Sequence, residues 1–340
     1  MDKLEKIFTE WDDADDFSGV ISITQKGTTV YEKVDGFRNR GEELPNQIDT
    51  AFGIASGTKL FTSTAICQLI DQGKISLESK LHDLLTHDLG NIPKEVTVLH
   101  LLSHSSGIAD YLDFNSKEEK IQFFDTHPVN LWTSNEYYLP LFSNKPPAFA
   151  LGEGADYSNS NFILLGLIIE AVSGMGYREY VMENIIKPLG LTRTGFHATN
   201  NLPANTAVGY AWDSKAEVYV GNYFRLPIIG AADGGLYTTA GDLEKFWTAL
   251  LGGKLYSSKM LEEVLTPRGV FEDIGGHFGL GIFVSEKDGK KVYWHDGGDY
   301  GVGFCTAYFP GNESVLSILV NVSVDLLSLS DEMIEAVAAI

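Results

Sequence analysis

A serine and a lysine stand three residues apart at the start of an apolar segment. The stretch IASGTKLFTSTAICQLIDQGK begins at residue 54 and contains Ser56 and Lys59. Residues three apart lie on one face of a helix, so the amine can reach the hydroxyl. A serine becomes a nucleophile when a neighbouring group takes its proton, and a lysine kept neutral by desolvation can do so. The spacing predicts a catalytic pair; the alternative is an N-cap serine beside a solvated lysine.

A tyrosine and an asparagine form a second candidate pair. The glycine-rich stretch GEGADYSNSN places Tyr157 and Asn159 just before a long apolar segment. In extended backbone, residues two apart point the same way. A phenol beside a lysine ammonium loses its proton more easily, and an asparagine amide can donate to a substrate carbonyl. We expect both side chains in the site, although a packed tyrosine and a helix-capping asparagine would give the same pattern.

The third candidate segment is KVYWHDGGDYGVGF. His295 ends a predicted strand there, and Gly297 and Gly298 follow. Glycines allow a substrate to approach the backbone closely. A strand-edge N–H at this point can complete an oxyanion hole with the N–H of Ser56. A second His-x-Gly begins at His277, and we prefer His295 because it lies between a β-rich segment and a double glycine.

The elements that must position these residues form a mixed α/β pattern. Two strands are predicted near the N-terminus, joined at Lys26-Gly27, and four near the C-terminus, beginning with FGLGIFVSE. Helices are predicted after Ser56, through most of 81–191 and at the chain ends. We expect an antiparallel sheet built from both chain ends and flanked by helices, together with an all-helical lobe. The α/β lobe would comprise 1–78 and 232–340, and the helical lobe 79–231.

In this order the three motifs resemble those of the serine β-lactamase and penicillin-binding-protein superfamily, in its class C β-lactamase-like branch. The superfamily motifs are Ser-x-x-Lys, Tyr-x-Asn and Lys-Thr-Gly or His-x-Gly. The stretches LLSHSSGI, IIKPLGLTRTGF and DGGLYTTAGDLEKF look similar as well, so the resemblance extends over nearly the whole chain. It implies a single serine hydrolase domain, 1–340, with two lobes and the site between them.

The resemblance also implies a role for each residue. Ser56 would form the acyl-enzyme, and Lys59 and Tyr157 would share the proton transfers. Asn159 would orient the substrate carbonyl, and the N–H groups of Ser56 and Gly298 would form the oxyanion hole. Neither a metal nor an organic cofactor is implied, and the substrate would be a small molecule or a short peptide.

The third motif departs from the Lys-Thr-Gly of many β-lactamases and carboxypeptidases, because Asp296 follows His295. A carboxylate in the pocket would repel a substrate carboxylate. The sequence therefore favours an ester or amide hydrolase for neutral or amine-bearing substrates. The alternatives are a D-Ala-D-Ala carboxypeptidase, a β-lactamase, or a penicillin-binding sensor that is acylated slowly. Asp296 would instead be remote from the site if strand alternation turns it away.

The amino-acid composition limits the kinds of partner that the protein is expected to bind. The 340 residues include 25 basic and 46 acidic ones, for a net charge of −21, which disfavours nucleic acid and anionic lipid. The N-terminus lacks the apolar region of a signal peptide, so we expect a cytoplasmic protein, or an exported one if a leader has been removed. The oligomeric state is left open. His100 and His104 have a spacing that can bind zinc, but no catalytic Glu lies between them, and we expect no metal site.

Overall fold

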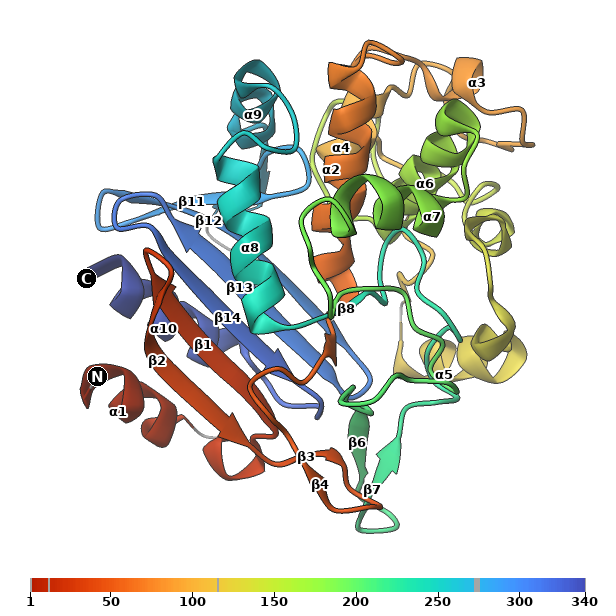
Figure 1. Cartoon of the computed structure of the whole chain (residues 1–340). Helices are drawn as coiled ribbons and strands as arrows, with labels where there is room; N and C mark the ends of the chain where they lie inside the picture. The colour runs from red at the N-terminus through yellow and green to blue at the C-terminus, as the bar shows by residue number, and fades with distance from the viewer. Residues whose placement is uncertain (1, 12, 115, 272–275, 340) are drawn as a thin grey trace.

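The structure is a computed structural model that describes residues 2–11, 13–114, 116–271 and 276–339. An antiparallel sheet of eight strands in these residues forms the centre of the fold, in the spatial order β2-β1-β14-β13-β12-β11-β10-β9 (Figure 1). Its strands are β1 (Gly19–Gln25), β2 (Thr28–Asp35), β9 (Gly269–Phe271), β10 (Gly276–Phe278), β11 (Phe283–Lys287), β12 (Lys290–Asp299), β13 (Val302–Phe309) and β14 (Ser314–Val320). The β1–β14 pairing joins the two ends of the chain, which confirms the predicted sheet.

Two of the predicted tight turns are present. Lys26 and Gly27 have φ values of 51° and 78°, and Asp288 and Gly289 have 50° and 73°. Two consecutive left-handed residues are typical of the type I′ turns that join twisted antiparallel strands. The first turn links β1 to β2 and the second links β11 to β12.

The segment FGLGIFVSE was predicted as one strand and is instead divided between β10 and β11. Gly281 breaks it with a left-handed φ of 79°. A Cβ at Gly281 would lie 2.3 Å from the Cβ of Ser63, and the Ser63 hydroxyl donates to the carbonyl of Leu280. The strand is interrupted because its backbone approaches a helix closely there.

Helices cover both faces of the sheet. Figure 1 shows α8 (Ala240–Leu251) on one face and α1 (Asp2–Glu10) with α10 (Leu327–Ala339) on the other. The remaining helices are α2 (Thr58–Asp71), α3 (Leu81–Leu84), α4 (Val98–Leu102), α5 (Lys117–Thr126), α6 (Asn159–Ser173), α7 (Tyr177–Val181) and α9 (Ser258–Leu265). The 3-10 turns are η1 (Ala14–Asp16), η2 (Ala55–Gly57), η3 (Val129–Leu131) and η4 (Asn135–Leu141), and a π-turn, η5 (Met182–Ile186), follows α7.

Three small pairs of strands supplement the main sheet. They are β3 (Phe37–Asn39) with β4 (Leu44–Pro45), β5 (Phe52–Gly53) with β8 (Tyr237–Thr238), and β6 (Tyr210–Asp213) with β7 (Val218–Gly221). The β6–β7 hairpin lies within 79–231, which was expected to be an all-helical lobe, in a part of it that the sequence indicated only as loop-rich; this segment is therefore not all-helical. β5 leads through η2 into α2, so the β5–β8 pair helps to place the start of that helix.

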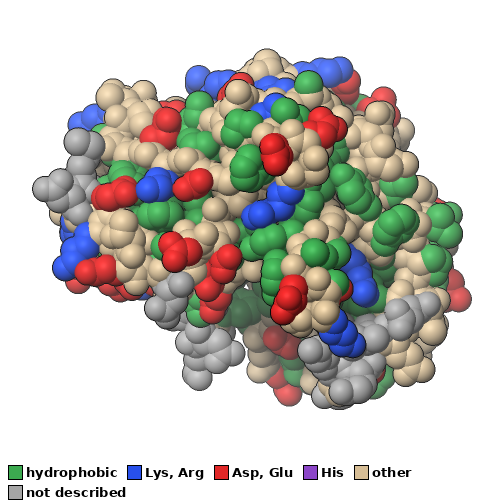
Figure 2. All heavy atoms as spheres, turned by 90° about the horizontal axis from the view of Figure 1, so that it is seen from below, with side chains coloured by type: hydrophobic (Ala, Val, Ile, Leu, Met, Phe, Trp, Pro, Cys, Tyr) green, Lys and Arg blue, Asp and Glu red, His purple; other side chains and the backbone are tan. Residues whose placement is uncertain are grey.

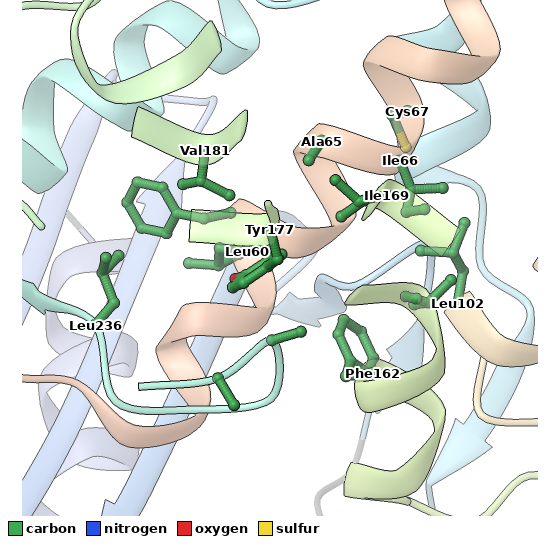
Figure 3. Packing of buried hydrophobic residues seen from close by; sticks show 14 of the residues in the cluster. Leu60, Ala65, Ile66, Cys67, Leu102, Phe162, Ile169, Tyr177, Val181 and Leu236 are labelled. Atoms are coloured by element: carbon green, nitrogen blue, oxygen red, sulfur yellow. The ribbon is translucent and has the colours of Figure 1, made fainter. Parts of the chain in front are cut away.

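The helix α2 lies in the interior, with every residue from Thr58 to Leu69 buried. Figure 3 shows its side chains Leu60 and Ile66 packed with Phe162 and Ile169 of α6 and with Val181 of α7. A helix buried on all sides is held by its neighbours rather than by one amphipathic face. A second apolar cluster fills the space between the sheet and the helices α1 and α10.

The outer surface is mixed in charge. Figure 2, seen from below Figure 1, shows acidic, basic and apolar side chains interspersed over one face. In the described part of the chain, none of the helices taken singly has the length and apolar character to cross a membrane. Only the pair Asn159–Ser173 and Tyr177–Ile186, bent by 77°, meets the length and composition limits jointly, and most of α6 is buried in the core.

Candidate active site

Ser56 lies where the chain turns from β5 into α2. It belongs to η2, directly after Ala55, whose φ of 42° is left-handed and costly for a non-glycine residue. A Cβ on Gly57 would lie 2.3 Å from the ring of Phe304, so the next position admits no larger residue without displacing that ring. This turn holds Ser56 in the wall of a pocket, close to the unpaired N–H groups at the helix start.

Lys59 reaches Ser56 as the spacing predicted. Its Nζ lies 3.0 Å from the Ser56 Oγ, 2.7 Å from the Asn159 Oδ1 and 2.7 Å from the backbone oxygen of Asp233. An amide oxygen and a backbone carbonyl can only accept hydrogen bonds. They hold two N–H groups of Lys59, so the lone pair of the neutral amine is directed at the Ser56 hydroxyl.

The surroundings of Lys59 favour that neutral form. The side chain is fully buried, and burial lowers its pKa to about 8 against the opposing pull of Asp233 and Asp110. At pH 7 roughly one molecule in ten then carries a neutral amine, compared with roughly one in a few thousand for an ordinary lysine. Burial therefore supplies a base that a solvated lysine would not.

Tyr157 lies beside this pair. Lys59 Nζ is 5.0 Å from the centre of its ring. Burial of the hydroxyl raises the pKa of Tyr157 well above its usual value, and a hydrogen bond with Ser56 opposes this rise only in part. The predicted loss of the phenol proton beside the lysine is therefore not favoured. Instead Tyr157 is protonated at neutral pH, which suits a proton donor rather than a base.

Asn159 is the first residue of α6 and connects Lys59 to a carboxylate. Its Oδ1 accepts from Lys59, while its Nδ2 and its backbone N–H donate to Asp110 Oδ2 at 2.8 and 3.1 Å. The amide group has two N–H hydrogens, and Asp110 takes one of them. Asn159 lines the pocket, so the second hydrogen is available to a substrate carbonyl.

The sequence reasoning missed Asp110 and Asp233. Asp233 is buried, and its Oδ2 accepts from the Tyr111 hydroxyl at 2.5 Å. Burial raises the pKa of both carboxyl groups, and the charge of Lys59 opposes this. No spacing links these residues to the three motifs. The one signal was that Asp233 opens the stretch DGGLYTTAGDLEKF, which contributed to the resemblance.

The residues of the third motif lie on β12 and point to both of its faces. Gly297 faces Ser56: a Cβ there would lie 2.8 Å from the Ser56 N and 2.5 Å from the oxygen of Ile54. Gly298 and Asp299 line the Ser56 pocket. His295 is buried below the site, where its Nδ1 donates to the carbonyl oxygen of Asp296 at 2.7 Å and burial lowers its pKa to about 3. This neutral imidazole is not part of the pocket wall.

Asp296 is not in the Ser56 pocket, contrary to the expectation that it lines it. It lines a different cavity, together with Cys305 of the neighbouring strand and Ser330 and Asp331 of α10. Successive residues of a strand point to opposite faces of the sheet. Because Gly297 faces Ser56, Asp296 must face away from it.

The pocket at Ser56 is small, with a volume of about 140 Å³. Asp233 and Asp299 are its acidic lining residues, and neither Lys nor Arg is present among the described residues that line it. Burial lowers the pKa of His197, which also lines it, so that imidazole is neutral at neutral pH. Tyr111, Tyr138 and Tyr237 add aromatic surface. Two carboxyl groups and three aromatic rings therefore line the pocket, next to the Lys59 amine at Ser56.

The zinc alternative finds no support in the described residues, which contain no group of three or more His, Cys, Asp or Glu arranged to hold a metal. His100 instead caps its own helix, since its Nδ1 accepts from the Thr97 N–H. Cys67 and Cys305 are both free and buried.

Comparison with known proteins decides the family. The sequence model of the Beta-lactamase family matches residues 4–337. The chain belongs to the Beta-lactamase family. This family assignment agrees with the resemblance inferred from the three motifs, and the antiparallel sheet with its flanking helices matches the fold of a solved penicillin binding protein.

Several known proteins are similar to this chain over most of its length. A penicillin binding protein from Bacillus halodurans is 35% identical, covers 99% of both chains and superposes with a TM-score of 0.88. A D-stereospecific amidohydrolase from Streptomyces sp. is 26% identical, with a TM-score of 0.82 and coverage of 98% of this chain and 97% of that one. PbpX of Bacillus subtilis (strain 168) is 31% identical over 271 residues, or 79% of this chain.

The chain spans 62% of the length of PbpX and 66% of a second relative from the same strain, a penicillin-binding protein. The proteins similar to this chain thus include ones named for penicillin binding and one named for amide hydrolysis.

Proposed function

We propose that the protein is a serine hydrolase that cleaves a small ester or amide through an acyl-enzyme on Ser56. One observation carries this proposal: Lys59 lies 3.0 Å from the Ser56 Oγ, is fully buried, and has a pKa of about 8. The Ser56 oxygen attacks the substrate carbonyl carbon while its proton passes to the Lys59 amine. The oxyanion that forms is stabilised by the backbone N–H groups of Ser56 and Gly298.

Tyr157 completes the first half of the reaction. Its phenol is protonated at neutral pH and interacts with Ser56, so it can donate a proton to the leaving oxygen or nitrogen. The carbonyl–leaving-group bond then breaks, and the Ser56 ester remains. The proton held by Lys59 restores Tyr157, and attack by water releases the acid in the second half. Asn159 orients the carbonyl with its remaining amide hydrogen.

The charge of the pocket supports a substrate class. Asp233 and Asp299 line it, and the described lining residues include neither Lys nor Arg, although Lys59 lies against Ser56 and carries its proton in most molecules at pH 7. A carboxylate about 4 Å from a like charge is disfavoured by about 4 kcal/mol at an effective dielectric of about 20, and solvent reduces this in an open pocket. We infer that neutral or amine-bearing esters and amides are preferred over penicillins and D-Ala-D-Ala peptides. Asp296 faces away from this pocket and lines another cavity, so this preference does not depend on its charge.

A penicillin-binding role is the second candidate, because relatives of this chain are named penicillin-binding proteins. The two candidates differ in turnover. A sensor or a carboxypeptidase would be acylated by a β-lactam and would bind a carboxylate. The acidic pocket argues against this outcome.

Labelling and turnover together test the proposal. A fluorophosphonate should add once to the protein, and peptide mass spectrometry should locate it on Ser56. Ser56→Ala should remove both the adduct and the turnover, whereas Ser76→Ala, at an exposed serine, should change neither. A label on a peptide without Ser56 would overturn the mechanism. Turnover is then compared between a neutral chromogenic ester, a D-amino-acid amide, a D-Ala-D-Ala peptide and a chromogenic cephalosporin. Preference for the last two would overturn the substrate class.

A further inference from the structure

His104 fixes the backbone on both sides of Tyr157. It follows the helix α4 in a left-handed conformation, with a φ of 56°. Its backbone oxygen accepts from the N–H of Asp156 at 3.0 Å, and its Nδ1 accepts from the N–H of Ser158 at 3.1 Å. The residues directly before and after Tyr157 are therefore bound to one and the same residue.

The imidazole also contacts the phenol ring. The ring centres of His104 and Tyr157 lie 4.5 Å apart at an angle of 30°. On its other sides the imidazole packs against Phe162, Phe271 and Phe278, with centre distances of 5.2, 6.2 and 4.8 Å. His104 is fully buried, so this aromatic group holds the imidazole, and the imidazole in turn holds Tyr157.

The hydrogen bonds define the form of the imidazole. Nδ1 must be an unprotonated acceptor to bind the Ser158 N–H, so the ring is neutral and its proton is on Nε2. Burial lowers the pKa of His104 well below its usual value, and the charge of Lys59 acts in the same direction. The acceptor therefore persists across the pH range in which Lys59 works as a base.

We propose that His104 is a positioning residue for Tyr157. It touches neither substrate nor Ser56; it sets the distance from the phenol hydroxyl to Ser56 and Lys59 by holding the backbone on both sides and one face of the ring. A core residue that only fills space would need the ring but no acceptor. A positioning role, in contrast, requires the Nδ1 lone pair of His104 as an acceptor.

Three variants separate the ring from the acceptor. His104→Phe keeps an aromatic ring and loses the acceptor. His104→Asn loses the ring, but its Oδ1 can accept where Nδ1 does, and asparagine tolerates a left-handed φ. His104→Gln keeps the volume, but its amide reaches the position of Nε2 rather than Nδ1. His100→Phe is the matched control, because the Nδ1 of His100 on α4 also accepts a backbone N–H, that of Thr97, but His100 does not line the Ser56 pocket.

The expected result is a loss in kcat that follows the acceptor. A misplacement of about 1 Å can cost about 100-fold, so His104→Phe and His104→Gln should lower kcat about 10- to 100-fold with KM changed less than about threefold. His104→Asn should retain kcat within about fivefold of the wild type even if its Tm falls further than that of His104→Phe. His100→Phe should keep the wild-type kcat. In a Tyr157→Phe background, His104→Phe should cost less than about threefold more, because it acts through the phenol.

This role of His104 rests on the proposed function only in that Tyr157 takes part in the reaction. The position of the Tyr157 hydroxyl can be measured independently of turnover. A crystal structure of His104→Phe should show the Tyr157 hydroxyl displaced from Ser56, while that of His104→Asn should show it in place. An unmoved hydroxyl in His104→Phe would overturn the proposal, as would equal kcat losses in the presence and absence of the Tyr157 hydroxyl. Absence of any Ser56 labelling in the wild type would instead contradict the proposed function, and the two crystal structures would still decide the role of His104.

Discussion

The start of α2 and the strand β12 both contribute to the Ser56 pocket, but they present their side chains differently. On the helix, Ser56 and Lys59 are three residues apart and meet at 3.0 Å. On the strand, Asp296 and Gly297 are adjacent and face opposite sides of the sheet, one toward α10 and the other toward Ser56. Spacing along a helix identifies neighbours, whereas adjacency along a strand separates them.

The two regions also differ in how they serve the site. The helix start supplies reactive groups whose protonation depends on burial and on three hydrogen bonds. The strand contributes backbone without a side chain, because any side chain at Gly297 would collide with the Ser56 N–H. Changes in the first region should therefore alter chemistry, and changes in the second should alter geometry.

The largest effects are expected from the reactive groups. Lys59→Ala and Tyr157→Phe should each lower kcat by about 100- to 10,000-fold, because each removes a partner of one proton-transfer unit. The double variant should lose little more than either single variant, since groups that act as a unit are not additive. Steady-state kinetics on a chromogenic ester gives the three ratios. Losses that multiply in full would mean that the two residues work independently.

The next effect tests the strand, with two adjacent glycines as a matched pair. Gly297→Ala would place a methyl group 2.8 Å from the Ser56 N and 2.5 Å from the Ile54 oxygen. We expect it to lower kcat about 10- to 100-fold, because the nucleophile must shift. Gly298→Ala has no heavy atom within 4 Å of its new Cβ and should cost less than about threefold. Equal losses of kcat in the two variants would show that the close approach to Ser56 is not the reason why position 297 requires glycine.

A smaller effect should appear in the pH profile. The active form of Lys59 is the neutral amine, so kcat/KM should rise with pH and level off above an inflection near a pKa of about 8. The Asp110 carboxylate favours the charged amine, and Asp110→Asn removes that attraction. The inflection should therefore move to lower pH.

Asp113→Asn, at an exposed carboxylate three residues further on, is the control and should leave the inflection in place. The pH dependence of kcat/KM, measured from pH 5 to pH 10 on a neutral ester, checks both variants. An upward movement in Asp110→Asn would contradict the assigned electrostatics of Lys59.

The smallest effect is expected at Asp296. Because its side chain lines the cavity beneath α10, Asp296→Thr should change kcat/KM for carboxylate-bearing and neutral substrates by the same factor, within about twofold. The ratio between a cephalosporin and a neutral ester measures this directly. A rise of tenfold or more in that ratio would show that Asp296 acts on the pocket after all, and would break the contrast between the two faces of β12.

Much of the fold followed from local patterns. The hairpins at Lys26-Gly27 and Asp288-Gly289 were predictable because type I′ turns require residues that tolerate positive φ. The division of FGLGIFVSE was not predictable, because Gly281 breaks the strand only through its contact with Ser63, which is distant in sequence. The β6–β7 hairpin was missed because no tight-turn signal stood out in its loop-rich segment.

The sequence by itself determined the pairing of Ser56 with Lys59 and the family to which the chain belongs, because helix geometry fixes neighbours three residues apart and the motifs recur in order. The tertiary structure alone decided the state of those groups. The lowered pKa of Lys59 depends on burial by other helices and on contacts with Asn159 and Asp233, which lie 100 and 174 residues away. Strand alternation within the assembled sheet likewise turned Asp296 out of the pocket. Burial and long-range contact are properties of the packed chain, so no local pattern could express them.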